Sequence, residues 1–324
     1  MRVEHLPREI LFRDIPHFDF ARCLAMIHRP FDDCLHRFGD DFVERMIRFE
    51  LGGNRWSAPC LVRLSGGRGE LRVQALKGRA HSERLQRYVA DWFDLERDLR
   101  PLARVAGRSE SVAALWKRYR GMRLVWVPAL FETLCWSVIG QQINLAFAYQ
   151  LKRRLVEAYG TSLEYRGRVY RHFPTPAELQ RATKARLLSM KFSRQKADYL
   201  MGLARLFSDA GNDVHSIRDL ETEAARESLI EIHGIGRWSA NYTLMRALKR
   251  IDCWPYGDAG LARAYLDEVA GTPEVKKVDW DAVEVFMGRF EGWQAYVTQV
   301  LWNAHGDARA PSSARRSGAA RKSQ

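Results

Sequence analysis

The sequence is poor in cysteine, and its five cysteines are widely scattered. They are odd in number and show no CxxC spacing, so a disulfide framework, a zinc knuckle or a four-cysteine iron–sulfur cluster is not expected. Long apolar runs are also missing. No run approaches the ~18 residues that a membrane span needs, and the N-terminus lacks the charged-then-apolar layout of a signal peptide. We therefore expect a soluble protein of a reducing compartment.

Acidic residues are too few to balance the basic ones. The 324 residues include 52 Lys and Arg against 39 Asp and Glu, which gives a net charge of +13 and a pI near 9.7. Only part of this excess comes from the C-terminal tail, residues 307–324, because that segment holds five basic residues and one acid. The rest of the chain is basic as well, which favours a polyanionic partner such as nucleic acid or an anionic membrane surface.

The first third of the chain has the pattern of a small antiparallel sheet. Short alternating runs over residues 41–76 are separated by the turn sequences GGN and GGRG. Helical stretches flank these runs near residues 19–28 and 81–99. We therefore predict an α+β domain over residues 1–109.

From about residue 110 the apolar positions recur with the 3.6-residue period of helices. This predicts an all-α domain over residues 110–306. The later helices are expected at 223–232, 237–249, 259–268, 280–288 and 292–304. The tail from 307 to 324 is rich in Ala, Ser, Gly and Arg and is expected to be disordered.

A tight turn, Gly234-Ile235-Gly236, joins two of these helices. We expect Ile235 to plug into the helix pair, and the N–H groups that open the next helix, at Arg237, to point outward as donors for a phosphate oxygen. The alternative is an ordinary helical hairpin whose glycines only satisfy backbone geometry.

The segment around this turn resembles the helix-hairpin-helix DNA glycosylase superfamily. Its pattern LxxIxGIGxxxA, which runs from Leu229 to Ala240, is followed past one helix by Asp258. The stretches FETLCWSVIGQQINLAFAYQL, FPTPAEL, SRQKADYL, GIGRWSANY, PYGDAGL and WQAYVTQVLW are similar to the bacterial 3-methyladenine DNA glycosylase II family and occur in the expected order. The resemblance implies a fold of class α+β, in which a helix-hairpin-helix domain follows the sheet domain.

The resemblance makes Asp258 the candidate catalytic residue. A carboxylate beside the sugar stabilises the positive charge that develops as the base leaves, and it can orient the attacking water. The alternative is that Asp258 only caps the helix that begins beside it, since Asp is a preferred N-cap. One residue is able to do both.

Trp238, Tyr242 and Trp293 match aromatic residues of the family's base pocket. An electron-rich pocket selects cationic alkylated purines by stacking and cation–π attraction. The alternative for each is ordinary core packing. Gln142 occupies the place of a wedge that fills the gap left by a flipped base, or it is simply a solvated polar residue.

The residues on either side of Asp258 depart from the family. Ala259 stands where an aromatic residue is frequent, and Gly257 stands where an acid can occur, so a wider pocket mouth is expected. Trp238 also replaces the lysine that bifunctional relatives use to form a Schiff base. The replacement of this lysine by Trp238 implies a monofunctional enzyme that leaves an abasic site.

The resemblance also implies the partners and cofactors. No organic cofactor and no iron–sulfur cluster are expected, but a monovalent cation, Na⁺ or K⁺, is expected on the carbonyls of Ile230, Ile232 and Ile235. Gly234, Gly236 and Arg237 would anchor the phosphates of double-stranded DNA that carries alkylated bases. We expect a monomer in the bacterial cytoplasm, associated with the nucleoid. Two alternatives stay open: an oxidised-base or mismatch glycosylase, and a non-catalytic DNA-binding or damage-sensing protein.

Overall fold

The computed structural model describes residues 1–309 with the exception of 29–30, 32, 53–54, 80–81, 210 and 212–213. The chain divides into two compact units. Unit 1 consists of Met1–Arg97 and Gly121–Arg250, and unit 2 consists of Asp98–Arg120 and the chain from Ile251 onward. These units do not follow the predicted boundary between residues 109 and 110, and the predicted domain limits stay a prediction. Most of the predicted disordered tail, residues 310–324, lies outside the described residues.

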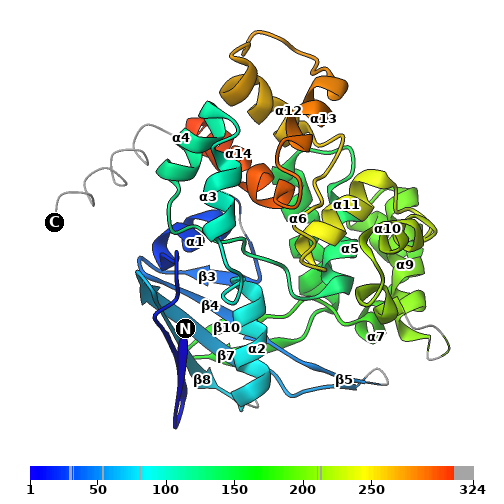
Figure 1. Cartoon of the computed structure of the whole chain (residues 1–324). Coiled ribbons are helices and arrows are strands. Elements are labelled where there is room, and N and C mark those ends of the chain that lie inside the picture. Colours follow the sequence, from blue (N-terminus) through cyan, green and yellow to red (C-terminus); the bar gives the residue numbers. More distant parts are fainter. Residues whose placement is uncertain are drawn as a thin grey trace. The chain divides into compact units, whose positions relative to one another are not determined.

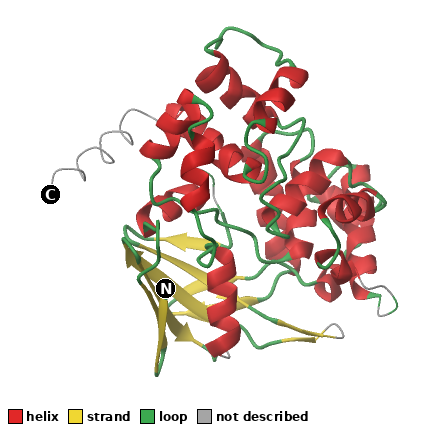
Figure 2. Cartoon of the chain, viewed as in Figure 1, coloured by secondary structure: helices red, strands yellow, loops and turns green. Residues whose placement is uncertain are grey.

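The described part of unit 1 contains a six-stranded antiparallel sheet in the order β1-β2-β8-β7-β4-β3 (Figures 1 and 2). Its strands are β1 (Arg2–Leu6), β2 (Glu9–Arg13), β3 (His36–Phe38), β4 (Phe42–Ile47), β7 (Cys60–Gly67) and β8 (Glu70–Lys77). Two short pairs accompany it: β5 (Glu50–Gly52) with β6 (Arg55–Trp56), and β9 (Ser162–Tyr165) with β10 (Arg168–Arg171). The predicted sheet over 41–76 is confirmed, whereas β1, β2, β3, β9 and β10 were not predicted.

The two faces of this sheet are covered by different elements. Helix α2 (Ser82–Trp92) lies on one face, where Trp92 contacts Arg45 of β4. On the opposite face the β9–β10 hairpin packs on the sheet, and Tyr170 forms a small apolar cluster with Met46 and Leu61. Adjacent residues of a strand point to opposite faces, so β4 contributes to both layers.

The helices of unit 1 include the predicted hairpin. They are α1 (Phe20–Ile27), α2, α5 (Leu130–Gly140), α6 (Leu145–Tyr159), α7 (Pro176–Leu179), α8 (Lys184–Ser189), α9 (Arg194–Ser208), η1 (Val214–Arg218), α10 (Thr222–Ile230) and α11 (Arg237–Arg246). Helix α5 packs against both α9 and α11. The helices expected at 223–232 and 237–249 are therefore confirmed as α10 and α11, each with an end that differs by a few residues.

A buried ionic network joins the sheet to the helices of unit 1. Arg45 of β4 lies 2.9 Å from Glu132 of α5, and Lys152 of α6 lies 3.7 Å from the same carboxylate. Burial alone would raise the pKa of Glu132, but Arg45 and Lys152 outweigh it and hold that pKa below its ordinary value. The network fixes α5, which leads into the turn that carries Gln142.

Unit 2 is helical. Its elements are α3 (Arg100–Ala106), α4 (Glu110–Arg118), α12 (Ala259–Tyr265), a π-helical turn η2 (Leu266–Ala270), α13 (Trp280–Gly288) and α14 (Gln294–Arg309). Helix α14 packs against α12 and α4. The predicted helix at 280–288 is confirmed as α13, and those at 259–268 and 292–304 appear as α12 and α14. None of the helices in the described chain is long and apolar enough to span a membrane.

Candidate active site and nucleic-acid interface

The hairpin between α10 and α11 has the predicted tight turn. Ile235 is buried, as are Leu229 and Ala240, so the expected plug between the two helices is confirmed. The Ile235 N–H donates to the carbonyl of Ile232 over 2.9 Å, which closes the turn.

The two glycines of the turn have different structural roles. Gly234 has φ +91°, and a Cβ at this position would lie 2.3 Å from the ring of Tyr199. Only glycine fits there, on grounds of both backbone conformation and space. Gly236 is extended, with φ −92° and ψ 180°, and a Cβ there would meet no atom within 4 Å. Gly236 is therefore not required by packing.

Gly236 is also the N-cap of α11, and no side chain caps this helix. A helix N-terminus carries partial positive charge and N–H groups without intrahelical partners. Gly236 and the following residue, Arg237, are both exposed. The backbone amides at this end are therefore not capped by a side-chain oxygen of α11.

Trp238 and Tyr242 project from the first turns of α11. Their rings are stacked, with centroids 5.4 Å apart and planes inclined by 23°. Both side chains are half-buried. The pair therefore offers an aromatic surface that is not wholly enclosed by the core of unit 1.

Gln142 lies in the turn between α5 and α6, exposed and with φ +56°. This left-handed conformation is uncommon for a residue other than glycine. The preceding residue, Gln141, donates through Nε2 to the carbonyl of Gly234 over 2.9 Å and to Oγ of Ser239 over 3.2 Å. The structure thus brings the Gln142 turn beside the hairpin.

Lys196 of α9 supports the same turn from inside unit 1. Its Nζ donates to the carbonyls of Ile139 and Gln141, at 2.5 and 2.8 Å. Burial lowers the pKa of this ammonium to about 8. A lysine at the C-terminal end of α5 is favourable, because the last carbonyls of a helix lack partners within the helix and accept hydrogen bonds from its ammonium group. Neither Gln141 nor Lys196 was predicted, since each acts through residues that are distant in the sequence.

Asp258, in unit 2, is the N-cap of α12. Its Oδ1 accepts the Leu261 N–H over 2.7 Å and the indole Nε1–H of Trp302 over 2.9 Å. The predicted cap is thus present. Trp302 is a second partner that the sequence did not predict, because it comes from α14, 44 residues further along the chain.

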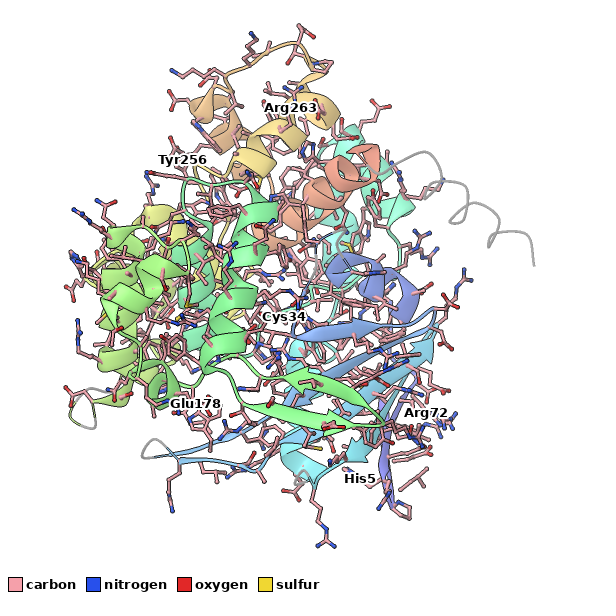
Figure 3. The ribbon with its side chains drawn as sticks, turned by 180° about the vertical axis from the view of Figure 1, so that it is seen from behind. His5, Cys34, Arg72, Glu178, Tyr256 and Arg263 are labelled. Atoms are coloured by element: carbon pink, nitrogen blue, oxygen red, sulfur yellow. The ribbon has the colours of Figure 1, made fainter. Side chains whose placement is uncertain are left out.

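Small residues beside Asp258 leave room for this contact. A Cβ at position 260 would lie 3.2 Å from Oδ1 of Asp258 and 3.5 Å from Nε1 of Trp302, so Gly260 keeps the pair uncrowded. The loop before Asp258 carries further aromatic residues. The ring of Tyr256, labelled in Figure 3, lies 5.6 Å from Trp254 and 5.0 Å from Trp280.

Trp293 belongs to the same unit as Asp258 and lies just before α14. Its half-buried ring meets the buried Tyr296 edge-on at 5.6 Å. The predicted site residues are therefore divided between the units: the hairpin, Trp238, Tyr242 and Gln142 belong to unit 1, whereas Asp258 and Trp293 belong to unit 2.

The hairpin carbonyls are the expected ligands of the monovalent cation. Of the carbonyls of Ile230, Ile232 and Ile235, only that of Ile232 accepts a backbone hydrogen bond within the described residues. Carbonyl oxygens are suitable ligands for such a hard cation, so these residues fit the group. No cluster of three or more His, Cys, Asp or Glu suited to a metal occurs in the described part of the chain.

The hairpin, the following aspartate and the preceding sheet together define a helix-hairpin-helix base-excision protein, and known proteins agree. The family model of the HhH-GPD superfamily base excision DNA repair protein matches residues 135–275. A DNA-3-methyladenine glycosylase of Bacillus subtilis is 32% identical over 305 residues, which cover 92% of this chain and 98% of that protein. DNA-3-methyladenine glycosylase 2 of Escherichia coli is 27% identical over 188 residues, 57% of this chain and 61% of that protein.

Solved structures share the fold. The 3-methyladenine DNA-glycosylase from Archaeoglobus fulgidus has a TM-score of 0.77 at 20% identity, covering 94% of this chain and 98% of its own. An 8-oxoguanine glycosylase/lyase of Clostridium acetobutylicum has a TM-score of 0.75 at 17% identity, with 96% and 99% covered.

The chain belongs to the 3-methyladenine DNA glycosylase family of the helix-hairpin-helix superfamily. It is a DNA glycosylase of base-excision repair, and its substrate is DNA.

Proposed function

We propose that this glycosylase excises alkylated bases of the 3-methyladenine type from double-stranded DNA and acts as a monomer. The observation that carries the proposal is the carboxylate of Asp258, held by Trp302 at the start of α12 and preceded in the chain by the hairpin. The 32% identity to the Bacillus subtilis DNA-3-methyladenine glycosylase supports the same substrate class.

The reaction begins when the damaged nucleotide leaves the duplex. The C1′–N bond then breaks, and its electron pair goes to the departing base while positive charge develops on the sugar. Asp258 stabilises this charge through its carboxylate, and water adds to C1′ and loses a proton. The Trp302 indole keeps the carboxylate oriented, because a hydrogen bond to a charged acceptor is stronger than a hydrogen bond between two neutral groups.

Base selection uses the aromatic surface of Trp238 and Tyr242. An alkylated purine carries a positive charge, which makes it a good leaving group and attracts it to the face of an aromatic ring. A contact of this kind contributes about 0.5 to 2 kcal/mol. Trp293 adds a third aromatic side chain to the same role, and Gln142 fills the gap left in the duplex.

The phosphate backbone is held at the N-terminus of α11. Gly236 leaves its amides without a side-chain cap, and Arg237 adds a positive charge beside them. A Na⁺ or K⁺ ion on the carbonyls of Ile230, Ile232 and Ile235 would supply a further positive charge toward the phosphate. This group of contacts does not depend on base identity, so it positions the DNA without selecting a lesion.

The enzyme is proposed to lack strand-cleaving activity. A lyase needs an amine that attacks C1′ to form a Schiff base, and Trp238 occupies the place of that lysine in bifunctional relatives. Borohydride should therefore trap no covalent protein–DNA adduct during turnover. An adduct on a denaturing gel would mean that another amine acts as the nucleophile.

Excision from three matched duplexes tests the substrate class. We expect 3-methyladenine to be released and 8-oxoguanine to be left in place. The hypoxanthine duplex tests whether the enzyme also excises an uncharged purine. Release of 8-oxoguanine alone would support an oxidised-base glycosylase on the same scaffold. Tight binding to all three without release of any base would support a non-catalytic damage sensor.

A further inference from the structure

A charged cavity lies in unit 1, on the face of the sheet covered by the β9–β10 hairpin. Figure 3 shows this hairpin crossing the sheet, and β10 contacts β4. Near one end of the hairpin a cavity of about 490 Å³ remains. Its lining includes five arginines but a single carboxylate, that of Glu44. None of these residues has a role in the chemistry of base excision proposed for Asp258.

Glu44 is almost wholly buried, and it holds two of the arginines in place. Arg63 donates through Nε and Nη2 to Oε1 of Glu44, at 2.9 and 2.5 Å, and Arg37 lies 3.5 Å from Oε2. The Tyr170 hydroxyl donates to Oε2 over 2.5 Å. The Glu44 carboxylate balances one positive charge, so its contacts fix the two guanidinium groups and still leave the cavity with an excess of positive charge.

Three further arginines line the cavity: Arg8, Arg166 and Arg168. All three are exposed, and none forms an ion pair with a carboxylate in the described chain. Arg166 has φ +49° and the next residue, Gly167, has φ +71°, so the tight β9–β10 turn sets the direction of the side chains around it. Five guanidinium groups against one carboxylate leave a formal excess of four positive charges.

We propose that this arginine cavity binds phosphate groups. An arginine fork matches the geometry of phosphate oxygens, and several guanidinium groups around one cavity repel each other unless an anion neutralises them. The volume falls within the range of roughly 300–1,000 Å³ that small-ligand sites occupy. The phosphates can come from the backbone of a DNA strand or from a free phosphorylated ligand. The first source rests on the proposed function, whereas the phosphate chemistry does not.

The test uses the full-length double variant Arg166→Ala/Arg168→Ala. Both side chains are exposed, and neither contacts Glu44, so the fold should be retained and the melting temperature should match that of the wild type. The matched control is Arg84→Ala/Arg87→Ala, which removes two exposed arginines from α2 on the other face of the sheet.

Two probes distinguish the sources. Calorimetric titration with inorganic pyrophosphate should show binding to the wild type and a loss of at least about tenfold in affinity in the cavity variant, with the control unchanged. Affinity for an undamaged duplex is then measured by anisotropy over a range of salt. Each phosphate that the cavity variant no longer neutralises should lower the log–log salt slope by about 0.9, relative to the control.

Every outcome decides the proposal. Loss of pyrophosphate binding together with a lower salt slope means that a DNA strand uses the cavity. Loss of pyrophosphate binding with a slope equal to the control means a free phosphorylated ligand, and a lower slope without measurable pyrophosphate binding means the DNA backbone alone. If the cavity variant matches the control with both probes, the proposal is overturned. Neither probe requires base excision, so failure of the lesion assays would leave this test intact.

Discussion

Two helix N-termini in this protein are built in opposite ways. Helix α11 begins at Gly236, which offers no side-chain cap, whereas α12 begins at Asp258, whose Oδ1 accepts a bond from Leu261. The first end leaves its amides for an outside anion, and the second brings an anion of its own. A helix N-terminus thus serves the proposed DNA binding in unit 1, where it is uncapped, and the proposed chemistry in unit 2, where Asp258 caps it.

Asp258→Asn should have the largest effect, because it removes the charge at the α12 terminus but keeps a side chain able to cap the helix. We expect the single-turnover excision rate at saturating enzyme to fall by about 100-fold or more, with DNA affinity unchanged. Asp252→Asn, an exposed change in the same loop, is the control. A variant that keeps most of its rate would show that Asp258 is only a cap.

Gly236→Asp converts the α11 terminus to the type found at α12. The position has open space and extended backbone, so the new carboxylate should cap the helix and hold or raise the melting temperature. The same carboxylate should repel phosphate, and affinity for all duplexes should fall by about tenfold or more, a loss of about 1.4 kcal/mol. Gly236→Ala, without the charge, should weaken binding less. Normal affinity in the aspartate variant would contradict the phosphate anchor.

Trp302→Phe tests the support of the α12 carboxylate. It removes the indole N–H that Asp258 accepts but keeps an aromatic ring in place. Loss of one hydrogen bond to a charged group should slow excision on the order of tenfold, while DNA affinity stays the same. The control is Trp116→Phe, in the same unit, where the ring packs edge-on against Tyr296. Equal rates for both variants would mean that Trp302 does not position the carboxylate.

The last expected effect is on stability rather than on excision, and it concerns the unit that carries the uncapped terminus. Burial lowers the pKa of His172 to about 4, so this imidazole stays neutral in the folded state while it gains a proton near pH 6.5 when unfolded. Its contribution to stability is therefore present at neutral pH and is lost as the pH falls from about 6.5 toward 4, by roughly 1 kcal/mol per pH unit. His172→Phe should flatten the dependence of the unfolding free energy on pH in that window. An unchanged dependence would show that other groups control it.

The sequence predicted those features that depend on local pattern. Apolar periodicity identified α10, α11 and α13, and turn residues located β4, β7 and β8. The β9–β10 pair was missed because its two short strands lie inside a long helical region, where only Arg166-Gly167 marks the turn. The β1–β2 hairpin was missed because its residues give no clean alternation of polar and apolar side chains.

In the candidate site, too, the features set by local sequence were predicted and those set by long-range packing were not. Gly234 to Gly236 and Asp258 are recognisable because they are close together in one segment of chain. The Trp302 contact to Asp258, and the Gln141 contact to Gly234, arise only when α14 and α5 are packed in place. No local signal specifies such long-range hydrogen bonds. The roles of the predicted site residues stay a prediction until the variants are measured.

Unit 2 has a consequence for the order in which the chain folds. It is made of two segments, and all of Gly121–Arg250 separates them. Helix α4 is synthesised early but cannot complete its packing until α14 has followed. Contacts between such distant segments form slowly because a long loop must close first. During synthesis on the ribosome, the hairpin of unit 1 can therefore be complete before Asp258 acquires its hydrogen bond from Trp302.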